Sequence, residues 1–344
     1  MYIRALKRQF LRIHPKWGVV IGFLLVAITL SLLIHAPFQF PSATSLLFIG
    51  FTYLLPFVFI GIWILLPLPF LIYRGELKDA IRRVFWQIND AFCFGVILIL
   101  HFHIKLWAPL INPASYDPVY EAIDRNCFSW IDPLISWRSQ WQFDWLNNLY
   151  FNAFALMFVC SFIVHNFQSR SQFRRVFLAS ILVQVIGAVC YLIAPAVGPF
   201  IYHQGANAHV TLAQHNLLMI HQALLAGGTN WLQLHTSEDV GAGLAAMPSL
   251  HIAASFVFLY YAQKYCRWLT WLYWPCFLWI IFEAMASRWH YGIDLIAGLA
   301  LAYGSICLAH KWLDAHEAAL APEQEPMPVE ELAPALTENL EKQD

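Results

Sequence analysis

Long apolar runs separated by short polar segments dominate the chain up to about residue 312. A helix needs about 20 consecutive apolar residues to cross the hydrocarbon core of a bilayer. Eight runs approach that length, near 17–35, 46–70, 88–107, 146–166, 176–196, 250–263, 269–286 and 291–312. The pattern predicts an all-α fold, a polytopic bundle of about eight membrane-spanning helices.

Some of these runs carry residues that break the pattern. The run at 46–70 contains Pro56, Pro67 and Pro69, so we expect it to be kinked or to end early. The run at 250–263 is short, and its helix would start a few residues earlier, near Ala245. The first run follows a basic segment, as in a signal peptide, but it exceeds the usual length of a cleaved apolar segment, so we interpret it as a retained helix.

The basic residues orient this bundle, because cytoplasmic loops are enriched in Lys and Arg. One predicted face collects Arg4, Lys7, Arg8, Arg12, Lys16, Arg74, Lys78, Arg82, Arg83, Arg170, Arg174, Arg175, Lys264, Arg267 and Lys311. The other face carries Lys105, Arg125, Arg138 and Arg288. We therefore expect a cytoplasmic N-terminus and, with eight spans, a cytoplasmic C-terminus.

The chain divides into four predicted segments: N-terminal transmembrane helices (1–107), an outer loop (108–145), a second transmembrane bundle (146–312) and an acidic tail (313–344). The outer loop holds Trp130, Trp137, Trp141 and Trp145, whose spacing predicts one face of a helix at the membrane interface. The tail carries nine acidic residues and four prolines, which is typical of a disordered segment.

A second outer loop is predicted at 197–249, and it contains no Lys or Arg. His203, His209, His215 and His221 recur there every six residues. Six residues turn an α-helix by about 240°, so these side chains would not share a helical face. No Cys/His zinc spacing accompanies them. We expect solvated loop histidines and no metal site.

Composition agrees with a membrane protein. Hydrophobic residues make up 60% of the 344 residues and charged residues only 12%, whereas soluble domains contain about 25% charged residues. No basic domain is present, so nucleic acid is not an expected partner. The seven cysteines show no CxxC spacing and lie mostly in apolar runs, which does not favour a disulfide framework.

Two polar clusters lie at predicted helix ends on the outer face. The first is Met247-Pro-Ser-Leu-His251, and the second is Ser287-Arg-Trp-His-Tyr-Gly-Ile-Asp294. One helical hairpin separates them, so both return to the same membrane depth. His290 and Asp294 are four residues apart, a spacing that allows a hydrogen bond on one helix face. A carboxylate on one imidazole nitrogen leaves the other nitrogen free to attack. Gly298, four residues further on, would let another helix approach closely.

These motifs are identified as similar to the membrane type 2 phosphatidic acid phosphatase superfamily. The form His290-Tyr-x-x-Asp-Leu-Ile-x-Gly298 resembles its inositol phosphorylceramide synthase-like branch, as does Tyr191-Leu-Ile-Ala-Pro-Ala-Val-Gly-Pro199. The resemblance spans about 175–312. It implies metal-independent phosphoryl transfer on a membrane lipid phosphate, without a cofactor. The catalytic residues would be His251, His290 and Asp294, and the substrate-binding residues Ser249 and Arg288.

The roles that the resemblance implies are specific. His290 would form a phosphohistidine, oriented by Asp294, while His251 would act as general acid and base. Ser249 and Arg288 would bind phosphate oxygens. The superfamily's Lys-x6-Arg-Pro motif is absent, and Ala284 stands where an Arg usually precedes the nucleophilic His. The cations that hold the phosphate are therefore left open.

Three alternatives remain at this point. Water or an alcohol would accept the phosphoryl group, giving a lipid phosphatase or a headgroup phosphotransferase. A membrane transporter would use the His/Asp cluster as a proton relay, although such sites lie near the bilayer midplane. Haem ligation by His101, His103 or His165 is less favoured than hydrogen bonding between helices. Neither the lipid nor the oligomeric state is specified by these residues.

Overall fold

The computed structural model describes residues 14–39, 53–66, 68–141, 143–146, 148–235 and 240–320. All regular secondary structure in these ranges is helical, without β-strands. Its α-helices are α2 (Pro15–Ile34), α4 (Leu55–Leu65), α5 (Leu68–Tyr73), α6 (Leu77–Ile111), α7 (Asp117–Cys127), α8 (Asp132–Arg138), α9 (Leu149–Gln168), α10 (Arg170–Ile193), α11 (Ala208–Leu234), α12 (Leu250–Tyr265), α13 (Arg267–Ala286) and α14 (Gly292–Leu320). Short 3-10 turns are η2 (Ser129–Ile131), η3 (Asp144–Leu146), η4 (Pro199–Ile201) and η5 (Val240–Ala242). The predicted all-α polytopic bundle is confirmed.

Six of the described helices are long and apolar enough to cross a membrane: α2, α6, α9, α10, α13 and α14. The run at 46–70 is divided into α4 and α5, as its prolines predicted. The helix α12 begins at Leu250, after Ser249 as N-cap, and not near Ala245. With 16 residues it is shorter than the six. Outward-facing side chains stay apolar, with Leu33 70% and Trp271 83% exposed, as lipid contact requires.

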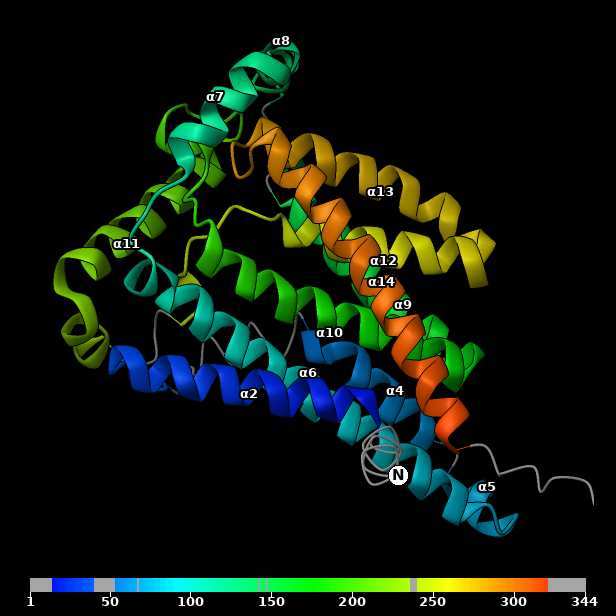
Figure 1. The fold of residues 1–344 in the computed structure, drawn as a ribbon. Coiled ribbons are helices and arrows are strands. Elements are labelled where there is room, and N and C mark those ends of the chain that lie inside the picture. The colour runs from blue at the N-terminus through cyan, green and yellow to red at the C-terminus, as the bar shows by residue number, and fades with distance from the viewer. Residues whose placement is uncertain are drawn as a thin grey trace, which may run out of the picture.

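The bundle is built around α10 and α12. Helix α12 packs against α9, α10, α13 and α14, while α10 also packs against α6, α9 and α14. Aromatic rings from four helices fill the centre: Phe94, Phe158, Phe162, Phe177 and Phe258. Figure 1 shows α7 and α8 at one end of the bundle, and α5 with the last turns of α14 at the other.

The prediction of a loop at 197–249 is wrong, because residues 208–234 form the helix α11. Asn207 caps its first turn by accepting a hydrogen bond from the Val210 amide (3.3 Å). The helix is kinked at Gly228, whose φ of 58° favours glycine. The leucines and alanines of α11 have high helix propensity and outweigh the polar residues between them. The loop was predicted from the absence of Lys and Arg, which carries no information about helix propensity.

The four tryptophans do not share one helix. Trp130 lies in η2, Trp137 in α8, and Trp145 in η3. Helix α8 ends at Arg138, whose side chain turns inward to a buried carboxylate. Only Trp137 and Trp141 pack together, with ring centroids 4.2 Å apart. The prediction of a single tryptophan face is therefore wrong.

The end of the chain also differs from expectation. Helix α14 continues to Leu320, so residues 313–320 are helical and not part of a disordered tail. Arg175 stabilises this extension through an ion pair with Asp314 (2.8 Å). The rest of the predicted tail, from residue 321, lies outside the described residues, as do Arg4, Lys7, Arg8 and Arg12.

Candidate active site

The second polar cluster forms a tight turn between α13 and α14. The amides of Trp289 and His290 both donate to the Ala284 carbonyl, at 3.0 and 3.1 Å. Arg288 adopts a left-handed conformation (φ 57°), which reverses the chain direction. His290 therefore precedes α14. The four-residue spacing had predicted that His290 and Asp294 lie on one helix face, and this prediction is wrong. Asp294 lies in the first turn of α14.

His290 is held by two oxygen atoms on the same ring nitrogen. Its Nδ1 lies 2.9 Å from the Ala246 carbonyl oxygen and 3.4 Å from Asp294 Oδ2. Because a carbonyl oxygen only accepts hydrogen bonds, Nδ1 carries the proton and Nε2 keeps its lone pair. Asp294 Oδ2 also accepts from the Tyr291 amide (2.9 Å). The carboxylate thus orients both the imidazole and the turn.

His251 lies in the first turn of α12 and reaches the same region. Its ring packs against Tyr150 and Phe154 of α9, with centroids 5.1 and 4.7 Å away. The Ser249 amide donates to the Asp294 backbone carbonyl (3.1 Å), joining the starts of α12 and α14. A Cβ atom on Gly298 would lie 2.5 Å from the Ser249 carbonyl oxygen, so glycine is required for this approach.

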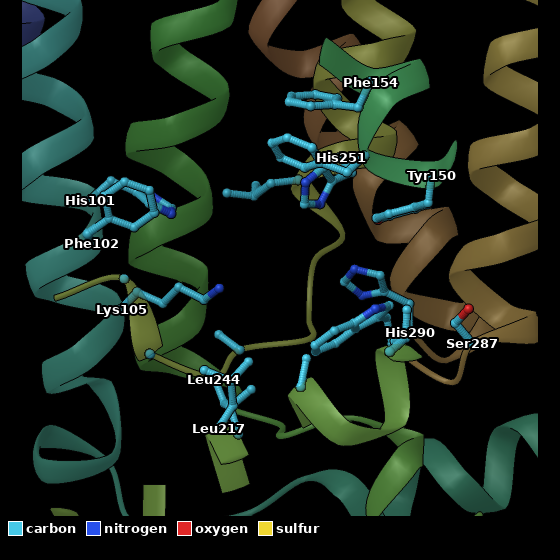
Figure 2. A pocket seen from close by; sticks show the side chains of 18 of the residues that line it. His101, Phe102, Lys105, Tyr150, Phe154, Leu217, Leu244, His251, Ser287 and His290 are labelled. Atoms are coloured by element: carbon cyan, nitrogen blue, oxygen red, sulfur yellow. The ribbon is translucent and has the colours of Figure 1, made fainter. Parts of the chain in front are cut away.

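The two histidines line one cavity of about 430 Å³. Figure 2 shows His251, His290 and Lys105 directed into it from three sides. Helix α6 contributes Lys105, the one Lys or Arg that lines the cavity among the described residues. Other lining side chains include His101, Tyr150, Phe154, Tyr191, His209 and Leu217. Four imidazoles and one ammonium line this otherwise largely apolar cavity, a combination suited to an anionic ligand.

The two predicted phosphate-binding residues occupy other places. Ser249 is buried beside α14, and its hydroxyl has no hydrogen-bond partner among the described residues. Arg288 points away from the cavity and donates to Asp132 Oδ1 (2.8 Å). The left-handed turn explains this direction, since it puts the Arg288 side chain on the opposite side from His290. Lys105 was missed as a site residue, although a cation within an apolar run is itself a functional signal.

Helix α7 fixes the His290 turn from outside the bundle. Asp117 is fully buried and accepts from the Tyr291 hydroxyl (2.9 Å) and from the amides of Val197 and Gly198. Asp124 accepts from the Gly292 amide (2.9 Å) at the start of α14, where a carboxylate is favoured. Burial raises the pKa of Asp124 to about 6; the Gly292 hydrogen bond opposes this rise.

A buried ion pair supports the other side of the turn. Arg138 of α8 forms two hydrogen bonds to Glu283 of α13, at 2.9 and 3.1 Å. The Ser287 hydroxyl donates to the same carboxylate (2.7 Å). Gln214 of α11 donates to the Ser287 carbonyl oxygen (2.8 Å). The turn that carries His290 is thus braced by α7, α8 and α11.

Three histidines of the predicted 197–249 loop lie in different surroundings. His203 contacts Glu121 (2.9 Å), His235 stacks on Trp231, and His209 lines the cavity. No group of three potential ligands in the described ranges is arranged to hold a metal ion. Of the haem candidates, His101 contacts the Gln184 carbonyl of α10 (3.0 Å), His103 contacts the Ile99 carbonyl, and His165 contacts Gln168.

Comparison with known proteins identifies the family. No curated protein and no solved structure matches the chain. The profile of the PAP2 superfamily matches residues 121–308, a range that contains the later part of α7, the Ser249–His251 segment and the His290 turn. The match covers more than half of the chain. The chain therefore belongs to the PAP2 superfamily.

Proposed function

We propose that this protein transfers the phosphoryl group of a membrane lipid phosphate through a phosphohistidine at His290. The observation that carries the proposal is the contact between His290 Nδ1 and the Ala246 carbonyl oxygen (2.9 Å). Its Nδ1 proton is directed to the Ala246 carbonyl oxygen, so the Nε2 lone pair is available for attack on phosphorus. A second imidazole, His251, lines the same cavity, and in this proposal it serves as the proton donor to the leaving oxygen.

The proposed reaction has two steps. His290 Nε2 attacks phosphorus, the bond from phosphorus to the lipid oxygen breaks, and His251 donates its proton to that oxygen. His251, now neutral, then removes a proton from the acceptor hydroxyl, which attacks the phosphohistidine and releases His290. Asp294 stabilises the positive charge that develops on the His290 ring. No metal or cofactor is required in this scheme.

We assign phosphate binding to Lys105. An ammonium directed into the cavity stabilises phosphate oxygens as negative charge develops on them. It takes the role that the sequence had assigned to Arg288, whose guanidinium is paired with Asp132. Ser249 contributes through its backbone, which joins α12 to α14. The distribution of basic residues favours the outer face of the membrane for this cavity.

Turnover of a radiolabelled lipid phosphate by the purified protein tests the proposal. We expect His290→Ala to lower turnover by at least about 10⁴-fold, as loss of a nucleophile does. His235→Ala is the matched control, because His235 stacks on Trp231 away from the cavity. Wild-type protein quenched in alkali should retain acid-labile label on His290. Full activity in the His290 variant contradicts the mechanism, and substrate flux in proteoliposomes without phosphate chemistry supports a transporter instead.

The products of the reaction reveal which molecule accepts the phosphoryl group. Water gives free phosphate, whereas an alcohol or another lipid gives a new phosphorylated product from the same intermediate. The HYxxD form favours the second outcome by its resemblance to synthases. Incubation with and without inositol lipids or other alcohol acceptors distinguishes the two. Free phosphate without a new lipid product identifies a phosphatase.

A further inference from the structure

A second hollow lies at the opposite end of the bundle from the candidate active site. It has a volume of about 1110 Å³ and lies between the end of α4, the start of α6 and the turn from α9 to α10. Four arginines and two carboxylates line it: Arg82, Arg83, Arg170, Arg174, Glu76 and Asp79. The excess positive charge of this lining makes the hollow suited to an anionic ligand.

The counter-charges inside the protein leave part of this positive charge unpaired. Asp90 binds two cations at once, Lys16 through Oδ1 (2.5 Å) and Arg170 through Oδ2. Asp79 contacts Arg82. Arg83 and Arg174 form no ion pair with any residue in the described ranges. The electrostatic balance therefore favours a ligand that brings its own negative charge.

Arg170 supplies further donors for such a ligand. Only its Nη2 reaches Asp90, while Nε and Nη1 are buried without a hydrogen-bond partner in the described part of the chain. Buried guanidinium donors are rarely left unsatisfied, because each costs desolvation free energy. An oxyanion in the hollow would satisfy them, since a guanidinium fork matches phosphate geometry.

The rim of the hollow distinguishes a lipid from a soluble phosphate. Trp63 of α4 is 64% exposed and packs edge-on against Phe167 of α9, with centroids 6.0 Å apart. Trp86 lies beside Arg170 and Lys16 as a cation–π partner. Indole rings favour the headgroup level of a bilayer, and exposed apolar surface of α4 continues from this rim. A headgroup in the hollow would thus continue into acyl chains along α4.

We propose that this hollow binds the phosphate headgroup of an anionic phospholipid, at a site separate from the His290 cavity. Basic pockets between transmembrane helices are suited to such headgroups. The bound lipid would join α4, α6 and the α9–α10 turn, which meet at the hollow. The site does not depend on the chemistry proposed for His290.

Lipid binding to the full-length protein in detergent tests this site. Retention of phosphatidylglycerol and phosphatidylcholine is measured by native mass spectrometry. We expect phosphatidylglycerol to be retained and phosphatidylcholine to be lost. The double variant Arg83→Gln, Arg174→Gln should weaken phosphatidylglycerol binding on the order of thirtyfold, the effect of two charges. The pair Arg83→Lys, Arg174→Lys keeps the charge and should bind within about threefold, which separates loss of charge from loss of fold.

Two controls separate this site from other binding. The variant Lys264→Gln, Arg267→Gln removes two exposed charges from the α12–α13 turn and should bind as wild type does. His290→Ala should also leave binding unchanged. Equal weakening in the control pair, or loss in the His290 variant, overturns the proposal. Displacement by glycerol phosphate at concentrations equal to the lipid also overturns it, in favour of a soluble ligand.

Discussion

The Nδ1 atom of His290 lies closer to the Ala246 carbonyl oxygen (2.9 Å) than to the Asp294 carboxylate (3.4 Å). The tautomer of the proposed nucleophile is therefore fixed by the backbone as well as by the carboxylate. The Ala246 amide is itself held by the Ala196 carbonyl (2.8 Å), so this acceptor is firmly positioned. The two oxygens have separable roles, one fixing the proton and the other balancing charge.

Asp294→Asn should consequently lower kcat by on the order of 10- to 100-fold, the effect of losing one hydrogen bond to a charged group. The loss stays well below that of His290→Ala, because the Ala246 carbonyl still holds the Nδ1 proton. Steady-state kinetics on a lipid phosphate measure this difference. A loss as large as that of the His290 variant would show that the carboxylate alone controls the tautomer.

Lys105 and Arg288 provide a matched pair of cation substitutions. Lys105→Gln should lower kcat/KM by about 100-fold if its ammonium stabilises phosphate charge as proposed. Arg288→Gln should change it by less than about threefold, since an ion pair with the exposed Asp132 contributes little. Kinetics of the two purified variants give the answer. A larger loss of kcat/KM in the Arg288 variant than in the Lys105 variant would indicate that Arg288 binds the phosphate.

Asp124 predicts a pH dependence of stability. Its pKa of about 6 in the folded protein exceeds the usual 3.8, so the folded state binds more protons between these values. Ionisation of Asp124 therefore lowers stability as pH rises from about 4 to about 6. Asp124→Asn removes this decline, so its Tm relative to wild type should rise over that window and level off above it. A pH-independent Tm difference would contradict the assignment.

The buried pair of Arg138 and Glu283 predicts a large effect on stability. Their side chains are only 2% and 1% exposed, so Arg138→Ala leaves a buried carboxylate unpaired and should cost about 3–5 kcal/mol. Arg125→Ala is the control, because Arg125 is 67% exposed in its pair with Glu121 and should cost about 0–1 kcal/mol. Denaturant unfolding in detergent measures both. Equal losses would show that the Arg138 pair is not a structural requirement.

Hydropathy predicted much of the fold because lipid contact demands long apolar runs. Each of the eight runs contains a helix, although one is divided at its prolines. Helix α11 was not predicted, since its glycines, glutamines and histidines dilute the apolar signal. The tryptophan segment was predicted as one helix because spacing alone does not reveal that Arg138 turns inward to Glu283.

The candidate site was predictable where the chain brings residues together locally. His251 and His290 line one cavity, as the return of the hairpin had indicated. Lys105 could not be assigned in the same way, because its position depends on how α6 is rotated against α10. Arg288 is two residues from His290 in sequence, but the left-handed turn separates their side chains. Backbone conformation of this kind is not visible in a motif.

The attachment of α7 to the His290 turn sets a lower limit on the length of an active fragment. Asp117 accepts a hydrogen bond from the Tyr291 hydroxyl, and Asp124 accepts one from the amide of the next residue, Gly292. A fragment that starts at residue 146 keeps both histidines and Asp294, yet it loses the acceptors that anchor the turn. Engineered fragments, fusions or circular permutants of this protein should therefore retain α7 together with α6, which carries Lys105.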